Sequence, residues 1–147
     1  VRRDPMAMLP FCGYNMGDYF RHWLEMGERI RRKPLIFNVN WFRTDDGGKF
    51  IWPGFGDNFR VLRWILDRCD GKVDAVETPI GYVPKAEDID LTDLEGFTLE
   101  DLRGILTIDA DLWQEEIKGI EEYFAKFDHL PGELRSQLDA LKKRFGI

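Results

Sequence analysis

Residues 40–58 combine five aromatic side chains with four glycines, and this combination could bind a flat molecule with polar edges. The segment reads NWFRTDDGGKFIWPGFGDN, and its rings are Trp41, Phe42, Phe50, Trp52 and Phe55. Aromatic faces stack on planar heterocycles, which contributes roughly 1–3 kcal/mol per base in nucleic-acid complexes. Glycines let the backbone approach a ligand closely. Asn58, or the free backbone amides where a helix begins, could then hydrogen-bond the edge of the ligand.

Aromatic residues are more often buried than exposed, so the same segment also has a purely structural interpretation. Its rings could form a small core that holds a hairpin together, with the glycines in the turns. The residue types and their spacing leave both interpretations open, although the general bias of aromatic side chains toward burial favours the small core.

The segment and its flanks are expected to fold as a hairpin followed by a helix. β-Branched and aromatic residues predict a strand over residues 35–42, and residues 49–52 predict the returning strand. The Asp-Asp-Gly-Gly sequence at residues 45–48 predicts a tight turn, because glycine adopts positive φ without steric cost. Asp57 is expected to cap the helix by accepting hydrogen bonds from its first amides. Asn58 would then lie at the helix start, beside the phenylalanines of the hairpin and loop.

Helical periodicity and capping residues predict most of the other elements. Helices are expected over residues 16–29, 58–68, 98–107 and 109–127 and after Pro131, with a strand over residues 76–83 that is interrupted by Pro79. Thr98 and Asp101 predict a capping box, and Asp109 predicts another helix start. The helix after Asp57 is expected to bury Val61, Leu62, Ile65, Leu66 and Cys69. The last two helices are expected to form an antiparallel pair.

The composition is that of an ordinary globular protein with room for one domain and a real core. The 147 residues are 44% hydrophobic and 33% charged. The net charge of -6 disfavours nucleic acid as a partner, since nucleic-acid-binding proteins are usually basic, but it permits binding of a single nucleotide. We expect no membrane partner, because no apolar run could span a bilayer and the polar start lacks a secretory signal. Cys12 and Cys69 lack metal-ligand spacing and are expected to be reduced thiols in a cytoplasmic protein.

No other group of residues in the sequence predicts catalysis or metal binding. His22 and His129 lack the partners of a catalytic triad or a zinc site. The sequence contains no Gly-x-x-x-x-Gly-Lys phosphate loop. The acidic residues between 87 and 93 lack the ligand spacing of an EF-hand. Four basic residues within 29–33 are expected to form a solvated helix end.

Four segments of the chain carry a resemblance to a known family. They are DPMAM (residues 4–8) with GYN (13–15), VNWFR (39–43), WPGFGDN (52–58) and TPIG (78–81). In this order they resemble the C-terminal part of GTP-dependent phosphoenolpyruvate carboxykinase. WPGFG followed by an acidic residue and Asn is a specific motif, and DPMAM followed by GYN is a second, independent one. Met6 and Leu9 depart from the family's usual pattern, so no role is assigned to the first segment.

The resemblance implies an α/β fold, helix-rich with a short aromatic hairpin, in which residues 1–147 form the C-terminal portion of the nucleotide (GTP)-binding domain. It also implies a guanine pocket. Phe42 and Phe55 would stack on the base, Phe50 would line its edge, Asn58 would contact the guanine rim, and Trp41 would belong to the same group.

The family reaction converts oxaloacetate and GTP to phosphoenolpyruvate, CO2 and GDP in gluconeogenesis, with Mn2+ and Mg2+ as metals. In that family the N-terminal substrate domain, the phosphate loop and the metal ligands lie upstream of the matching region. The resemblance therefore implies that these parts are absent from this chain. Val1 is not an initiator methionine, so we expect a part of a larger enzyme that is inactive alone and monomeric when complete.

The source of base selectivity and one rival function stay open at this stage. A backbone amide at the helix start near Asn58 is expected to donate to guanine O6 and to select against adenine, which presents a donor there. The Asn58 side chain could assist, but an amide group can flip, so selectivity is assigned mainly to the backbone. The rival function is a non-catalytic interaction module whose aromatic hairpin docks a peptide or a partner helix.

Overall fold

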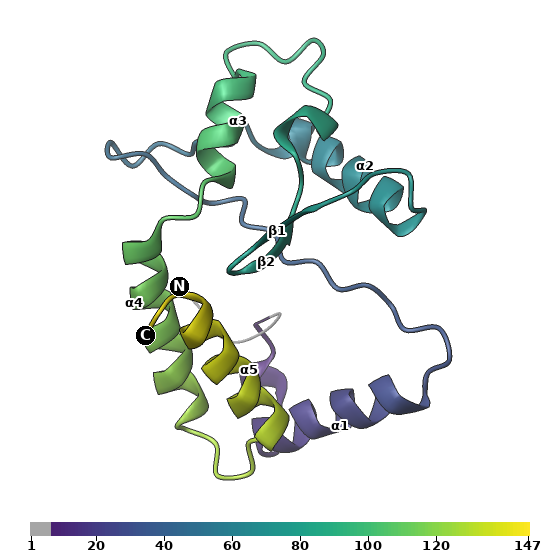
Figure 1. Cartoon of the computed structure of the whole chain (residues 1–147), viewed down its shortest axis with the longest axis vertical. Coiled ribbons are helices and arrows are strands. Elements are labelled where there is room, and N and C mark those ends of the chain that lie inside the picture. Colours follow the sequence, from purple (N-terminus) through teal and green to yellow (C-terminus); the bar gives the residue numbers. More distant parts are fainter. Residues whose placement is uncertain (1–6) are drawn as a thin grey trace. The chain divides into compact units, whose positions relative to one another are not determined.

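The computed structural model describes residues 7–147, and within them it contains five α-helices and one two-stranded antiparallel sheet (Figure 1). The described chain divides into two compact units, residues 7–34 with 109–147 and residues 35–108. The elements in order are α1 (Met16–Arg29), α2 (Asn58–Cys69), β1 (Val76–Thr78), β2 (Gly81–Val83), α3 (Leu99–Leu106), α4 (Ala110–Phe124) and α5 (Gly132–Arg144). The helix-rich character with a small sheet agrees with the expected α/β class. Residues 4–6 of the first motif lie outside the described residues.

The first unit packs α1, α4 and α5 around a small, mostly aromatic core. Met16, the first residue of α1, has 1% of its surface exposed, and it packs with Tyr123, Phe127 and Leu130. The side chain of Asn15 caps α1 by accepting a hydrogen bond of 2.8 Å from the amide of Gly17. Helices α4 and α5 run antiparallel and contact each other, as the sequence predicted (Figure 1).

A close backbone approach joins α1 to the segment between α4 and α5. Gly17 has no side chain, and an added Cβ would lie 2.6 Å from the carbonyl carbon of His129 and 2.8 Å from the amide nitrogen of Leu130. The carboxylate of Asp18 lies 3.1 Å from Nδ1 of His129 at the same place. Only glycine fits between these two pieces of backbone without a shift.

The second unit is built around two buried tryptophans. Trp52 is 6% exposed and Trp64 is 5% exposed, and the other buried members of their cluster are Ala86, Ile89, Phe97 and Leu102. The ring of Phe97 meets the indole of Trp52 edge to face, with 5.4 Å between centroids. Trp52 begins the WPGFGDN motif and Trp64 lies in the helix that follows it, so their burial packs the motif and α2 on the cluster with Phe97 and Leu102.

The predicted helix starts in this chain are largely confirmed. The predicted capping box holds the start of α3, where the Asp101 amide donates to Thr98 Oγ1 at 3.2 Å and the Thr98 amide donates to Asp101 Oδ2 at 2.7 Å. These bonds from Thr98 lower the pKa of the Asp101 carboxyl. Asp109 caps α4 by accepting from the amides of Asp111 and Leu112. Gly71, with φ of 70°, follows the last turn of α2, where a left-handed residue commonly ends a helix.

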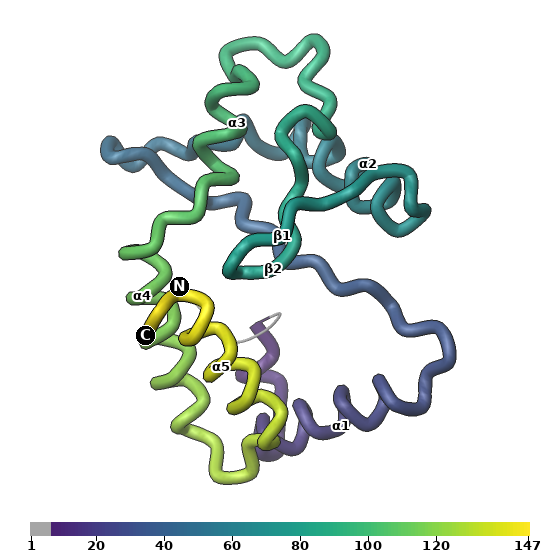
Figure 2. Tube along the Cα trace, in the orientation of Figure 1, coloured from purple at the N-terminus to yellow at the C-terminus, as the bar shows by residue number. Residues whose placement is uncertain are grey.

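The predicted strand over residues 35–42 is wrong. This run is extended and is visible as a long uncoiled path after α1 (Figure 2), but its backbone makes no ladder with any other described residue. Residues 49–52 likewise contribute only one isolated bridge, between Phe50 and Thr44. A strand requires a hydrogen-bonded partner, and residue types that favour extended backbone do not supply one. Residues 76–83 form the hairpin of β1 and β2 instead of one interrupted strand, with Thr78 opposite Gly81.

Two expectations about α2 are also corrected. Its buried face carries Trp64 with Val61 and Ile65, whereas Leu62, Leu66 and Cys69 are exposed. The helix is apolar on two faces, so periodicity alone did not decide which one the core covers. Asp57 makes no capping hydrogen bond, because its carboxylate is paired with Nε of Arg60 at 2.9 Å.

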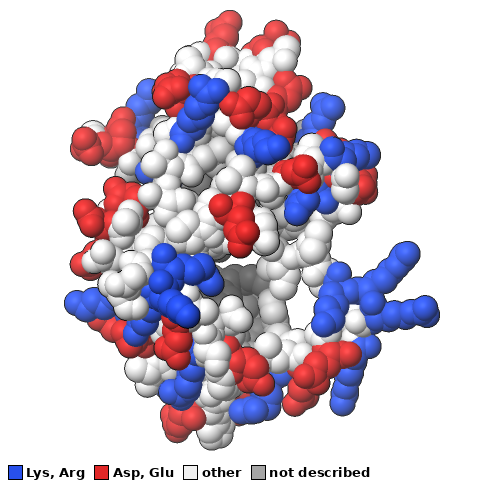
Figure 3. Space-filling model, in the orientation of Figure 1, with Lys and Arg blue, Asp and Glu red and all other residues white. Residues whose placement is uncertain are grey.

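Surface charge is mixed, and one basic group stands apart at the end of α1 (Figure 3). Arg29 lies in the last turn of that helix, and Arg31, Arg32 and Lys33 follow it, all exposed. Cations are favourable at a helix C-terminus, so the predicted solvated helix end accounts for this group. Within the described residues, no helix has both the length and the apolar composition needed to cross a bilayer.

Two glycines of α1 give a matched test of the close approach at His129. Gly17→Ala is expected to lower the free energy of unfolding by about 1–3 kcal/mol, because the added methyl overlaps backbone that cannot move aside cheaply. Gly27→Ala, in the same helix but with open space at its Cβ position, is expected to raise it by about 0.5–1 kcal/mol. Urea unfolding of the chain, followed by circular dichroism, measures both. Equal effects at the two positions would contradict the packing described here.

Candidate functional site

The aromatic segment folds as a tight hairpin that one carboxylate holds closed. Asp45 Oδ1 accepts hydrogen bonds of 2.9 Å from the amides of Gly47 and Lys49. The backbone closes the same turn, since the Gly48 amide donates to the Asp45 carbonyl and the Ile51 amide donates to the Arg43 carbonyl. Gly48 has φ of 78°, the left-handed conformation that glycine adopts without strain. The turn therefore brings the residues before position 44 alongside those after position 49.

This turn places two phenylalanine rings side by side on the surface. The centroids of Phe42 and Phe50 lie 5.9 Å apart with an interplanar angle of 60°. Phe42 is 72% exposed, Phe50 is 57% exposed, and Phe55, on the loop that follows, is 96% exposed. These values contradict the interpretation of the three rings as a buried mini-core. The structure brings Phe42 and Phe50 into contact, whereas Phe55 stands free at the start of the 3-10 turn Phe55–Asp57.

The two tryptophans of the segment pack toward the core, unlike its phenylalanines. Trp52 is part of the buried cluster of the second unit, and Trp41 is half-buried and packs against that cluster. Arg43 ties the same stretch to α3, since its Nη1 donates to the Ile105 carbonyl at 2.7 Å. The segment thus divides into tryptophans that anchor it and phenylalanines that face solvent. Whether Trp41 contributes to a ligand site stays a prediction.

Asn58, the first residue of α2, is held by one of the anchoring tryptophans. Its Oδ1 accepts a hydrogen bond of 2.8 Å from Nε1 of Trp52. The backbone amide of Asn58 donates to the Phe55 carbonyl. This amide is therefore already engaged, contrary to the expectation that a backbone amide here would donate to a ligand. Sequence reasoning missed the contact between Trp52 and Asn58, because it depends on which way a buried indole faces. The one feature of the sequence that could have indicated this contact is the six-residue spacing of Trp52 and Asn58 on either side of a Pro-Gly turn.

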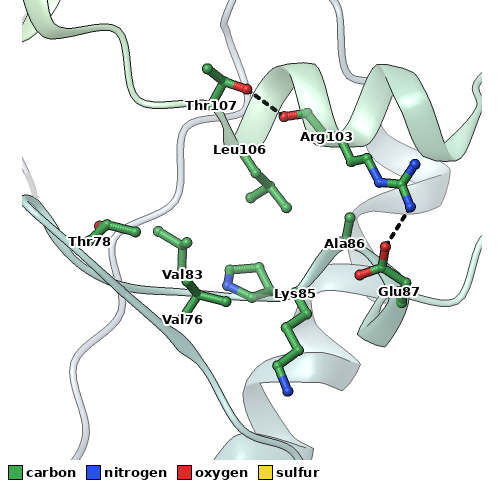
Figure 4. Close-up of a pocket in the computed structure, with 10 residues that line it drawn as sticks. Val76, Thr78, Val83, Lys85, Ala86, Glu87, Arg103, Leu106 and Thr107 are labelled. Atoms are coloured by element: carbon green, nitrogen blue, oxygen red, sulfur yellow. Dashed lines mark hydrogen bonds and ion pairs between the residues drawn. The ribbon is translucent and has the colours of Figure 1, made fainter.

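A shallow depression elsewhere in the second unit does not resemble a ligand site. Its volume is about 300 Å3, and it is lined by Val76, Thr78, Val83, Pro84, Lys85, Ala86, Glu87, Arg103, Leu106 and Thr107. Leu106 and Val83 point into it, and at its edge Arg103 Nη2 lies 2.7 Å from Glu87 Oε1 (Figure 4). Hydrogen bonding from Arg103 lowers the pKa of the Glu87 carboxyl, and the two side chains form an ion pair. The lining offers apolar contact with no free polar group aimed inward.

The described residues contain no group of three or more His, Cys, Asp or Glu side chains placed to hold a metal ion. His129 pairs with Asp18, and the acidic residues near α3 engage Arg103 or cap the helix. The chemistry available at the hairpin is stacking by exposed rings and hydrogen bonding by one fixed amide.

The described residues form a helix-rich fold that presents three exposed phenylalanine rings, with one asparagine amide held by a buried indole. The family model described as the phosphoenolpyruvate carboxykinase C-terminal P-loop domain matches residues 1–144, and the chain belongs to this family. It is 51% identical over 146 residues to a protein of Thermoplasma volcanium named phosphoenolpyruvate carboxykinase (GTP). It is 52% identical over 147 residues to the protein of that name from an Arthrobacter species.

A third relative of the same name, from Treponema pallidum, is 50% identical over 148 residues. These alignments cover 99%, 98% and 98% of this chain but only 24% of each relative. The chain therefore spans about a quarter of the length of the curated relatives that it matches. The expected family is confirmed, and the similarity extends through α4 and α5, where the sequence motifs were weak.

The contribution of the Asp45 carboxylate to closing the hairpin can be measured by comparing substitutions at Asp45 and at the adjacent Asp46. Asp45→Ala is expected to speed hydrogen exchange of the Gly47 and Lys49 amides about fivefold, since each loses a hydrogen bond worth ~1 kcal/mol. Asp46→Ala is the control, because Asp46 is exposed and the turn amides donate to Asp45 instead. Exchange measured by NMR compares the variants. Unchanged exchange in Asp45→Ala would show that the backbone alone closes the turn.

Proposed function

We propose that this chain is the guanine-nucleotide-binding part of a longer GTP-dependent phosphoenolpyruvate carboxykinase. The complete enzyme converts oxaloacetate and GTP to phosphoenolpyruvate, CO2 and GDP in gluconeogenesis. The observation that carries the proposal is the exposure of Phe42, Phe50 and Phe55 in a segment whose two tryptophans pack on the core. Membership of the family, over nearly the whole chain, supports the same conclusion.

The exposed phenylalanines would bind the purine base by stacking. Three apolar rings left in water are unfavourable for the free protein, and a base that covers them removes that apolar surface from solvent. The edge-to-face arrangement of Phe42 and Phe50 leaves their outer faces and edges available. Phe55, 96% exposed on the next loop, can supply the second face, and Phe50 can line the edge of the base. Trp41 would support the pair from the core side.

The polar contact would come from the side chain of Asn58. The backbone amide of Asn58 is engaged with Phe55, so at this residue the side-chain NH2 group is the donor that remains. Guanine presents O6, an acceptor, and adenine presents an amino group at the same position. A buried donor left unpaired against adenine costs about 1–3 kcal/mol, which corresponds to roughly ten- to a hundredfold in affinity.

The remainder of the enzyme would supply everything else that the reaction needs. Oxaloacetate or phosphoenolpyruvate, the phosphate loop and the ligands for Mn2+ and Mg2+ would be held outside this chain. When bound, the metals stabilise negative charge on the transferred phosphoryl group. This chain holds the base, and through it fixes the position of the nucleotide relative to the substrate. We further propose that the complete enzyme is a cytoplasmic monomer without nucleic-acid or membrane partners.

Removal of one stacking face tests the base site directly. Phe55→Ala in the full-length protein is expected to weaken GTP binding by about 1–3 kcal/mol and to leave oxaloacetate binding nearly unchanged. Because Phe55 is almost fully exposed, the substitution leaves no cavity and folding should be unaffected. Tyr82→Ala, at a ring that is 67% exposed on β2, is the matched control. Titration calorimetry measures both ligands.

Two results of that experiment would contradict the proposal. Equal weakening of GTP and oxaloacetate would indicate a general structural role for Phe55. An unchanged GTP affinity would favour the rival function, an interaction module whose aromatic hairpin docks a protein partner.

The chain on its own is expected to lack carboxykinase activity. The described residues hold no metal-ligand group, and the sequence has no phosphate loop of the Gly-x-x-x-x-Gly-Lys type. Purified 1–147 is assayed with oxaloacetate, GTP and manganese, beside the full-length protein as positive control. Turnover at the level of the full-length protein, retained after repeated purification, would show that the catalytic groups lie within this chain.

A further inference from the structure

The indole of Trp52 is a rigid hydrogen-bond donor. It is 6% exposed, belongs to the core cluster of the second unit, and is held edge to face by Phe97 at 5.4 Å between centroids. A buried ring packed in this way cannot turn without opening the core. Its Nε1 reaches Asn58 Oδ1 at 2.8 Å, a short and well-formed hydrogen bond.

This contact decides the orientation of the Asn58 amide on chemical grounds. The oxygen and nitrogen of an asparagine amide are interchangeable in shape, but an indole N–H can only donate. The group facing Trp52 must therefore be the amide oxygen, and the planar NH2 group is directed away from the core. A flipped amide would set two donors against each other inside the protein, at a cost that keeps this state sparsely populated.

The hydrogen bond from Trp52 also affects the donor on the other side of the amide. Accepting a hydrogen bond at the carbonyl oxygen polarises an amide and strengthens the donation from its nitrogen. Among the described residues, no acceptor lies against Asn58 Nδ2, so both of its hydrogens are available to a ligand. Asn58 stands three residues after Phe55, and its backbone amide donates to the Phe55 carbonyl.

We propose that Trp52 is a positioning residue, which fixes the Asn58 amide with its NH2 group outward and so makes the site prefer 6-oxopurine over 6-aminopurine nucleotides. This inference rests on the proposed function and adds its specificity determinant. A fixed NH2 group donates to O6 of a 6-oxopurine and clashes with the amino group of adenine. An amide free to flip would present its oxygen to adenine and its nitrogen to guanine, and would distinguish the two poorly.

A double-mutant cycle in the full-length protein separates positioning from packing. The readout is the ratio of dissociation constants, ATP over GTP, with ITP as a second 6-oxopurine. Trp52→Phe, which keeps an aromatic ring but removes the N–H, is expected to lower the ratio about tenfold. In the Asn58→Ala background the same substitution should leave the ratio unchanged. The ratio of ITP to GTP should stay constant in all variants, because both bases carry O6.

A second substitution removes the donor with less disturbance of the core. Replacement of Trp52 by benzothienylalanine, in which sulfur takes the place of the N–H, retains the two fused rings, and it is expected to lower the ATP-to-GTP ratio as Trp52→Phe does. This variant keeps the test valid if Trp52→Phe fails to fold.

The outcomes distinguish this inference from the function on which it rests. An equal change of the ratio in the Asn58 and Asn58→Ala backgrounds, or no change with benzothienylalanine, would overturn the positioning role of Trp52. If Phe55→Ala weakens GTP binding in the same assays, the proposed function survives that result. An unaffected GTP affinity in Phe55→Ala would instead overturn the proposed function, and the inference with it.

Discussion

The second unit depends on the burial of Trp52 in the cluster that also contains Trp64 of α2 and Leu102 of α3. This one side chain links the hairpin to the core through its contact with Phe97, and it links the hairpin to α2 through its hydrogen bond to Asn58. Ile51 and Trp41 pack against the same cluster, whereas Phe42, Phe50 and Phe55 are exposed. The phenylalanines stay exposed because the backbone path imposed by the tryptophans leaves them no core to enter.

Features that depend on short stretches of chain could be predicted from the sequence. The capping box of Thr98 and Asp101 and the cap at Asp109 involve residues three positions apart or fewer, so local chemistry decides them. The positive φ of Gly71 at the end of α2 follows in the same way. The family could also be predicted, since its motifs are contiguous, and the family match confirms it.

Features that depend on distant partners could not be predicted in the same way. Residues 35–42 have strand-forming side chains, yet strand formation requires a neighbour that the local sequence does not specify. Helix α2 carries apolar residues on two faces, and only the position of the core shows that Trp64 is buried while Leu66 is not. The five candidate residues were identified from the motifs, but the amide orientation at Asn58 followed only from the tertiary position of Trp52.

The hairpin is closed by contacts between residues only a few positions apart, from Asp45 to Lys49 and from Arg43 to Ile51. Contacts of such low sequence separation form early, and isolated hairpins close in about 1–10 μs. The rings of Phe42 and Phe50 should therefore be paired while the chain around them is still disordered. The two rings are 72% and 57% exposed in the folded chain, so the later steps of folding do little to cover the pair.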